Sequence, residues 1–73
     1  MATTEIGSPV TGTVWKVELA VGDKVEEGDV IMILESMKME IPLEAPEAGV
    51  IAKLTVEPGA SVDEDQILCV LES

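Results

Sequence analysis

The sequence contains the same 29-residue pattern twice, and this repeat limits the possible folds more than any other feature. Residues 8–36 align with residues 45–73 at a constant offset of 37 positions, without a gap. Nine of the 29 pairs are identical, and they include the prolines and glycines at Pro9 and Pro46, Gly12 and Gly49, and Gly22 and Gly59. Two copies, unlike a long array, predict one domain with internal two-fold pseudo-symmetry.

Both copies have the pattern of short strands separated by turns. In the first copy, residues 12–19 and 30–34 are rich in aliphatic and β-branched side chains, and turn signals such as Gly22-Asp23 separate them. Residues 3–8 and their counterpart, 39–44, add one strand to each half. Because no stretch has helical periodicity for more than one turn, we predict an all-β fold, a sandwich or closed barrel of about eight strands in two sheets. Exchange of strands between the halves would protect the edges of such short sheets.

One strand in each half departs from simple alternation. Val14 and Val17 are both apolar although their spacing is odd, which predicts a bulge or sharp twist between them. Trp15 lies in the same segment and corresponds to Ala52 in the second copy, so this position accepts very different side-chain sizes. We expect a half-exposed indole there, and a stacking platform for a ligand is the less favoured alternative.

Composition limits the fold and the partners. The 73 residues allow a single domain, 1–73, with an aliphatic core, since Trp15 is the only aromatic residue. A net charge of −11, without arginine, excludes binding to nucleic acid or to an anionic membrane surface through electrostatics. Cys69 has no cysteine partner and is expected to be a buried, inert thiol. There is no signal peptide and no bilayer-length apolar run, so we expect a cytoplasmic location.

The residues offer little for catalysis. The sequence has no His, Arg or Tyr, and its acidic groups, such as Glu26-Glu27 and residues 63–65, fall in expected turns. Carboxylates work as an acid and base pair only in a dry cleft that separates their pKa values, so these are expected to be solvated charges. No glycine-rich phosphate loop is present. We therefore predict that the chain is not an enzyme by itself.

Lys38 is the exception, because its position lacks a structural explanation. It lies in Glu35-Ser36-Met37-Lys38-Met39-Glu40, between two predicted strands, where it would occupy a hairpin tip. Two-residue hairpin turns favour pairs such as Asn-Gly, and a broken local rule often marks a functional site. A plain surface lysine is the alternative, but the flanking Met37 and Met39 have no evident core to join. A flexible lysine suits an amide-linked prosthetic group, if a modifying enzyme deprotonates the amine and supplies an activated acyl donor.

The segment 35–40 resembles the biotin attachment site of biotinyl domains in the biotin carboxyl carrier protein family, whose usual pattern is Glu-Ala-Met-Lys-Met. The resemblance covers nearly the whole chain, including Gly12, Gly22-Asp23, Ala45-Pro46 and Gly59. It implies a flattened β-barrel, or barrel-sandwich hybrid, of two four-stranded antiparallel sheets with the lysine hairpin at one end and the termini at the other.

The resemblance also implies a function. A biotin protein ligase would attach biotin to Lys38, and Met37 and Met39 would help to present it, with Glu35 and Ser36 as the hairpin context. A biotin carboxylase would carboxylate the biotin, and the chain would carry the group as carboxybiotin to a carboxyltransferase acting on an acyl-CoA or similar acceptor. Tethering would raise the local concentration of the cofactor at both enzymes.

Two departures and two alternatives accompany this resemblance. Ser36 replaces the usual Ala, a small change that we expect to be tolerated, and no insertion after the second predicted strand forms the protruding thumb of some carriers. Because the sequence begins at Met1 without a Pro/Ala-rich linker, it resembles free-standing biotin/lipoyl attachment proteins or an excised biotinyl domain. The alternatives are a lipoyl domain, which Met37 and Met39 argue against, and an unmodified adaptor in which Lys38 would be replaceable.

Overall fold

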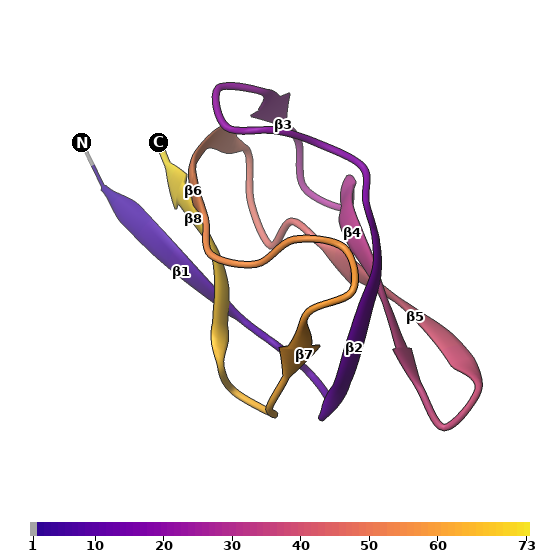
Figure 1. Ribbon diagram of the computed structural model, residues 1–73. Coiled ribbons are helices and arrows are strands. Elements are labelled where there is room, and N and C mark those ends of the chain that lie inside the picture. The colour runs from indigo at the N-terminus through magenta and orange to yellow at the C-terminus, as the bar shows by residue number, and fades with distance from the viewer. Residues whose placement is uncertain (1) are drawn as a thin grey trace.

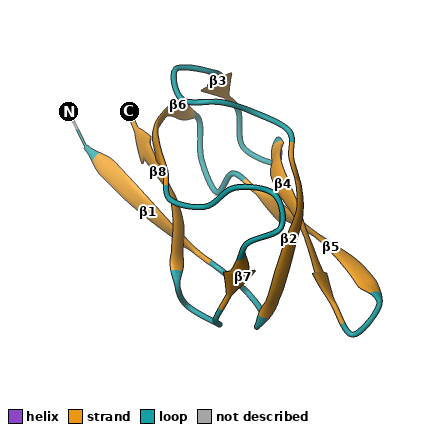
Figure 2. Cartoon of the chain, viewed as in Figure 1, coloured by secondary structure: helices purple, strands orange, loops and turns teal. Residues whose placement is uncertain are grey.

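The computed structural model describes residues 2–73, and within this range the regular elements are all strands (Figure 2). The eight strands are β1 (Thr3–Gly7), β2 (Gly12–Val17), β3 (Lys24–Val25), β4 (Val30–Ser36), β5 (Met39–Glu44), β6 (Gly49–Leu54), β7 (Ser61–Val62) and β8 (Ile67–Glu72). The predicted all-β class is therefore confirmed. No helix in residues 2–73 is long and apolar enough to cross a membrane.

The strands form two four-stranded antiparallel sheets, with orders β1-β8-β6-β3 and β5-β4-β2-β7. The offset of 37 residues maps each strand of the first sheet onto the strand at the same place in the second, which confirms the pseudo-symmetry. Each sheet takes two strands from each half of the chain, so the predicted exchange of strands is also observed (Figure 1). The edge strands β3 and β7 have only two residues each, which limits pairing with other chains.

The core lies between the sheets and is built from corresponding residues of the two halves. The central strands β4 and β8 contribute fully buried side chains at equivalent positions: Ile31 and Leu68, Met32 and Cys69, and Leu34 and Leu71. As expected, this core is aliphatic, and Cys69 is a buried free thiol. Matching side chains from both copies fill one space, which explains why the repeat keeps apolar character at these positions.

The bulge expected in each half is present. The register of β2 with β4 shifts between Val14 and Lys16, and that of β6 with β8 shifts between Ile51 and Lys53. The extra residue lets Val14 and Val17 both turn inward, Val14 into the core and Val17 to a half-buried place beside it. β2 ends at Val17, two residues before its predicted end. Glu18 still donates a backbone hydrogen bond to Ile31 before the chain turns toward β3.

The hairpin of β4 and β5 and the two ends of the chain lie at opposite ends of the molecule (Figure 1). The first and last strands pair with each other, with Thr3 opposite Glu72. The molecule is elongated, measuring 36 × 17 × 17 Å. The segment between β2 and β3 is a tight turn, in which the amide of Ala20 donates to the carboxylate of Asp23 at 2.8 Å, and it contains no thumb.

Candidate functional site: the lysine hairpin

Lys38 lies in a two-residue turn between β4 and β5, as the sequence predicts. Ser36 pairs with Met39 on either side of this turn. Both turn residues have positive φ angles, 52° at Met37 and 67° at Lys38, which is the backbone of a type I′ hairpin turn. The right-handed twist of the strands favours this turn, although neither residue is glycine, asparagine or aspartate. The structure therefore confirms that a two-residue hairpin turn forms here without the Asn, Asp or Gly residues that such turns prefer.

The side chains around the turn face solvent. Met37 is 92% exposed and Met39 is 65% exposed, whereas Met32 is fully buried in the core. Lys38 is exposed and takes part in no ion pair among residues 2–73. Large apolar side chains without a core to join are unusual on a surface, and here two of them flank the amine. This end of the molecule therefore presents an accessible amine with an apolar border.

Glu35 and Glu40 lie next to the turn and directly opposite each other on the two strands. Like charges at opposite positions of an antiparallel pair destabilise it slightly, so strand stability does not explain this choice of residues. Both carboxylates are exposed, and they give the base of the hairpin a negative charge. The structure thus brings all five predicted site residues, 35–39, into one projecting hairpin.

The base of the hairpin rests on the start of β2. A Cβ atom added to Gly12 would lie 2.3 Å from the carbonyl oxygen of Glu35, a distance that no side chain can occupy. Ser36 Oγ also donates a hydrogen bond to the Thr11 carbonyl at 3.0 Å, and the Glu64 amide donates to Thr11 Oγ1 at 3.0 Å. The first bond attaches the hairpin to the loop before β2, and the second attaches that loop to the turn after β7.

Sequence reasoning missed both supporting residues as part of the site. The glycine could have been found, because Gly12 and Gly49 are identical in the repeat and precede the bulged strand of each half. Nothing in the sequence marks Thr11, since its contacts join segments that are 25 and 53 residues away along the chain. Ser36 differs from the usual Ala by a hydroxyl, and this hydroxyl makes the hydrogen bond to the Thr11 carbonyl.

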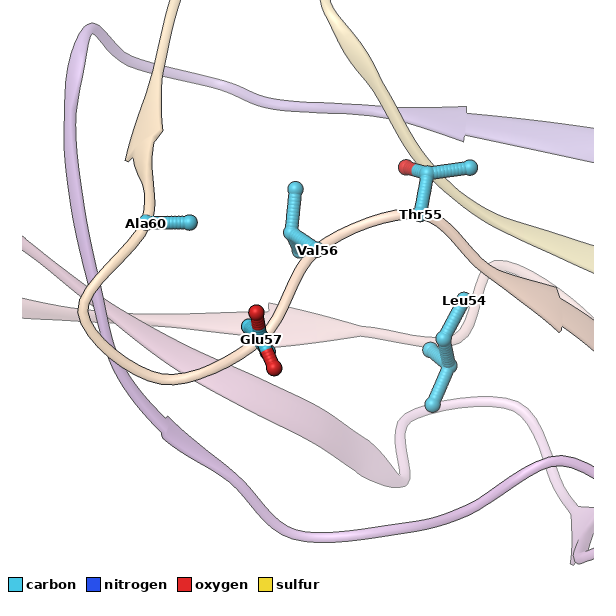
Figure 3. A pocket seen from close by; sticks show the side chains of 5 residues that line it. All are labelled: Leu54, Thr55, Val56, Glu57 and Ala60. Atoms are coloured by element: carbon cyan, nitrogen blue, oxygen red, sulfur yellow. The ribbon is translucent and has the colours of Figure 1, made fainter.

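A cavity on the described surface lies beside the hairpin, on the sheet that contains β4 and β2. It has a volume of about 240 Å³ and is lined by Thr13, Val14, Trp15, Glu35 and Gly59. Trp15 is 49% exposed, as the sequence predicts. Figure 3 shows a different cavity, of about 310 Å³, which is open to solvent and is lined by the end of β6 and the loop after it. There the Thr55 hydroxyl already donates to the Ile67 carbonyl at 2.6 Å, and Glu57 is the only titratable side chain in the lining.

Comparisons with known proteins agree with this geometry. The model of the Biotin_lipoyl family, described as "Biotin-requiring enzyme", matches residues 1–71. The chain is 39% identical over 64 residues to the biotin/lipoyl attachment protein of Bacillus subtilis, with 88% of each chain covered. It is 41% identical over 63 residues to the biotin-dependent acyl-coenzyme A carboxylase alpha3 subunit of Mycobacterium leprae, covering 86% of this chain and 10% of that protein.

A solved structure of a carboxylase has the same fold as this chain. The urea carboxylase of Kluyveromyces lactis superposes with a TM-score of 0.92 at 33% identity, covering 99% of this chain and 6% of the carboxylase. The chain therefore spans nearly all of a small attachment protein and only a small part of the carboxylases that it resembles. Because the family model matches residues 1–71 and the attachment protein matches over 88% of its length, the chain belongs to the biotin/lipoyl attachment family.

Proposed function

We propose that the chain is a biotin carboxyl carrier module and that Lys38 is the residue that a biotin protein ligase biotinylates. The observation that carries the proposal is the turn itself. An exposed lysine occupies a positive-φ position at one end of the molecule, between two methionines that are exposed without a packing role. Positive φ at two adjacent residues other than glycine costs free energy, and such strain concentrates at functional sites.

The residues at the turn fit an amide-linked group. The Lys38 side chain is exposed, and the turn lies beyond the last pair of β4 and β5, Ser36 with Met39, so a ligase can approach the amine from several directions. The rigid hairpin fixes the root of the arm, and the lysine stem supplies its reach. When attached, biotin supplies a ureido nitrogen that accepts and gives up a carboxyl group. The chain contributes presentation and high local concentration, and it is a non-catalytic carrier.

The partners in this proposal are a biotin carboxylase, which loads the carboxyl group, and a carboxyltransferase, which passes it to an acceptor. Two of the three similar proteins named above are carboxylases, one for an acyl-coenzyme A and one for urea, which supports an acceptor chosen by the carboxyltransferase and not by the carrier. An acyl-CoA or similar acceptor remains part of the proposal. The net charge of −11 would guide the module toward basic surfaces on these enzymes, at a rate that falls with added salt. We propose a cytoplasmic setting for these encounters.

The first test is the intact mass of the chain after coexpression with a biotin protein ligase and free biotin. We expect a single biotinyl increment, which peptide mapping places on Lys38. The variant Lys38→Arg should remain unmodified, and the matched control Lys24→Arg, at an exposed position of the edge strand β3, should be modified like the original chain. An increment on another lysine, or none with the fold intact and the ligase active on a control, would overturn the assignment.

A lipoyl carrier is the second candidate, because the matching family includes lipoyl attachment domains. Met37 and Met39 favour biotin, since lipoyl domains more often carry Asp before the lysine and a small residue after it. Incubation with a lipoate ligase and lipoate distinguishes the two by mass. Retained cellular function in Lys38→Arg would instead favour the unmodified adaptor and exclude both carriers.

A further inference from the structure

We propose that the cavity beside Trp15 is a resting site for the ring of the biotin on Lys38, so that the arm folds back onto its own domain. This inference rests on the proposed biotinylation. The lining of the cavity carries an indole from Trp15, a hydroxyl from Thr13 and a carboxylate from Glu35. This lining suits a group with an apolar face and a polar edge.

The lining suits the chemistry of the biotin ring. The ring has an apolar sulfur-containing half and a ureido half with two N–H donors and one carbonyl acceptor. Glu35 offers acceptor oxygens for the N–H groups, Thr13 offers a hydroxyl that donates to the carbonyl, and Trp15 offers a flat apolar surface. Lys16 Nζ lies 5.9 Å from the centre of the indole ring, so Trp15 takes part in a cation–π interaction and also lines the cavity.

The arm is long enough to reach the cavity. Thr13 pairs with Glu35, three residues before Lys38, and Trp15 lies in the bulge just beyond, so the two β2 side chains share the outer face of the hairpin sheet. At about 3.4 Å per residue, the cavity lies roughly 10 Å from the turn. A lysine extended by a five-carbon acyl chain places about eleven bonds between Cα and the ring, and the extended zig-zag spans roughly 14 Å because each bond of about 1.5 Å advances the chain by about 1.25 Å.

The internal symmetry supplies an independent argument. The counterparts of Thr13 and Glu35 in the second copy, Val50 and Glu72, line another cavity, of about 440 Å³, beside Ser73. The counterpart of Trp15 is Ala52, which is not part of the lining of that cavity. The indole is thus a large departure from the repeat, and it lies on the same sheet as the lysine turn, on a neighbouring strand. A shared role explains why they occur together.

The test uses the single tryptophan of the chain as the probe. The unmodified and fully biotinylated proteins, verified by intact mass, are compared by tryptophan emission and by acrylamide quenching. A ring resting on Trp15 excludes solvent and quencher from the indole. We therefore expect biotinylation to shift the emission to shorter wavelength and to lower the quenching constant by about two-fold or more.

Three controls make the result specific. The double variant Trp15→Ala/Ala52→Trp moves the only tryptophan to the equivalent site in the other sheet, where biotinylation should leave emission and quenching unchanged. Lys38→Arg mixed with an equal concentration of free biotin should also show no change, because the tether supplies the effective concentration. Thr13→Val keeps the strand and removes the hydroxyl, so its biotinylated form should be quenched more strongly than biotinylated protein with Thr13.

The outcomes separate this inference from the proposed function. A missing biotinyl increment would contradict the proposed function before any fluorescence is measured. A complete increment with identical emission and quenching in both forms of the original chain would overturn the resting site and leave the carrier intact. An equal change in the double variant would also overturn it, since the effect would then not come from this cavity.

Discussion

At the scale of single residues, the turn at Met37 and Lys38 shows a conflict between folding and function. Residues other than glycine, asparagine and aspartate lose about 1–2 kcal/mol each in the left-handed region, because Cβ approaches the following carbonyl. The structure accepts this cost at two adjacent positions, with φ angles of 52° and 67°. Asp65, at 70°, is the third non-glycine residue with a positive φ angle among residues 2–73, but aspartate tolerates this conformation through local hydrogen bonding.

The variant Met37→Asn should stabilise the fold by about 1 kcal/mol, because asparagine is favoured at the first position of a type I′ turn. Urea denaturation measures the change. Met39→Asn is the matched control, since it makes the same side-chain change in the extended strand β5 and should give no stabilisation. Equal effects at both positions would show that the turn conformation is not strained.

At the scale of elements, the hairpin depends on how closely β2 approaches β4. Gly12 allows the strands to meet where Thr13 pairs with Glu35, next to the turn. The equivalent glycine in the other sheet is less crowded, since a Cβ atom at Gly49 would lie 2.9 Å from the Glu72 carbonyl oxygen. The two glycines therefore serve the same purpose in the two halves, with the tighter contact beneath the lysine hairpin.

Gly12→Ala should destabilise the domain by about 3 kcal/mol, because backbone must move to admit the methyl group, and such backbone and steric changes account for the large effects of single substitutions. Gly49→Ala should cost less, since its clash is shallower. Urea denaturation of the two variants gives the comparison. A smaller loss for Gly12→Ala than for Gly49→Ala would contradict the close contact at the base of the hairpin.

At the scale of the whole molecule, the two sheets enclose one core, so global unfolding exposes every buried group together. Cys69 lies at the centre of this core, and its burial raises the pKa of its thiol above the ordinary value of 9.0. Above that pH, the unfolded chain releases the thiol proton while the folded chain retains it. The unfolded state then binds fewer protons, and the free energy of unfolding falls as pH rises.

The stability of the domain should therefore decrease above pH 9 more steeply than that of Cys69→Ala, by up to about 1.4 kcal/mol per pH unit. Denaturation at a series of pH values from neutral to alkaline measures both slopes. The two proteins differ only at residue 69, so the difference between their slopes isolates the thiol. Parallel pH profiles would show that the thiol is not desolvated in the folded state.

The sequence predicted much of this architecture because its main signals are local or repeated. Apolar spacing and turn residues located the strands, and the repeat indicated both the pseudo-symmetry and the bulges at Val14 and Ile51. The lysine hairpin was also visible, since it joins the two copies and breaks a turn rule. The expected end of β2 was two residues late, because Leu19 packs against the core from a turn and so resembles a strand residue.

Tertiary structure alone decided which groups surround the hairpin. The close contact of Gly12 with Glu35, the hydrogen bonds of Thr11 and the cavity beside Trp15 all join segments that are far apart in the chain. Apolar periodicity reports which face of a strand is buried, and it contains no information about which strand lies beside it. The sequence therefore determined the fold and the position of the lysine, and the packing of β2 against β4 determined the surface that its arm can meet.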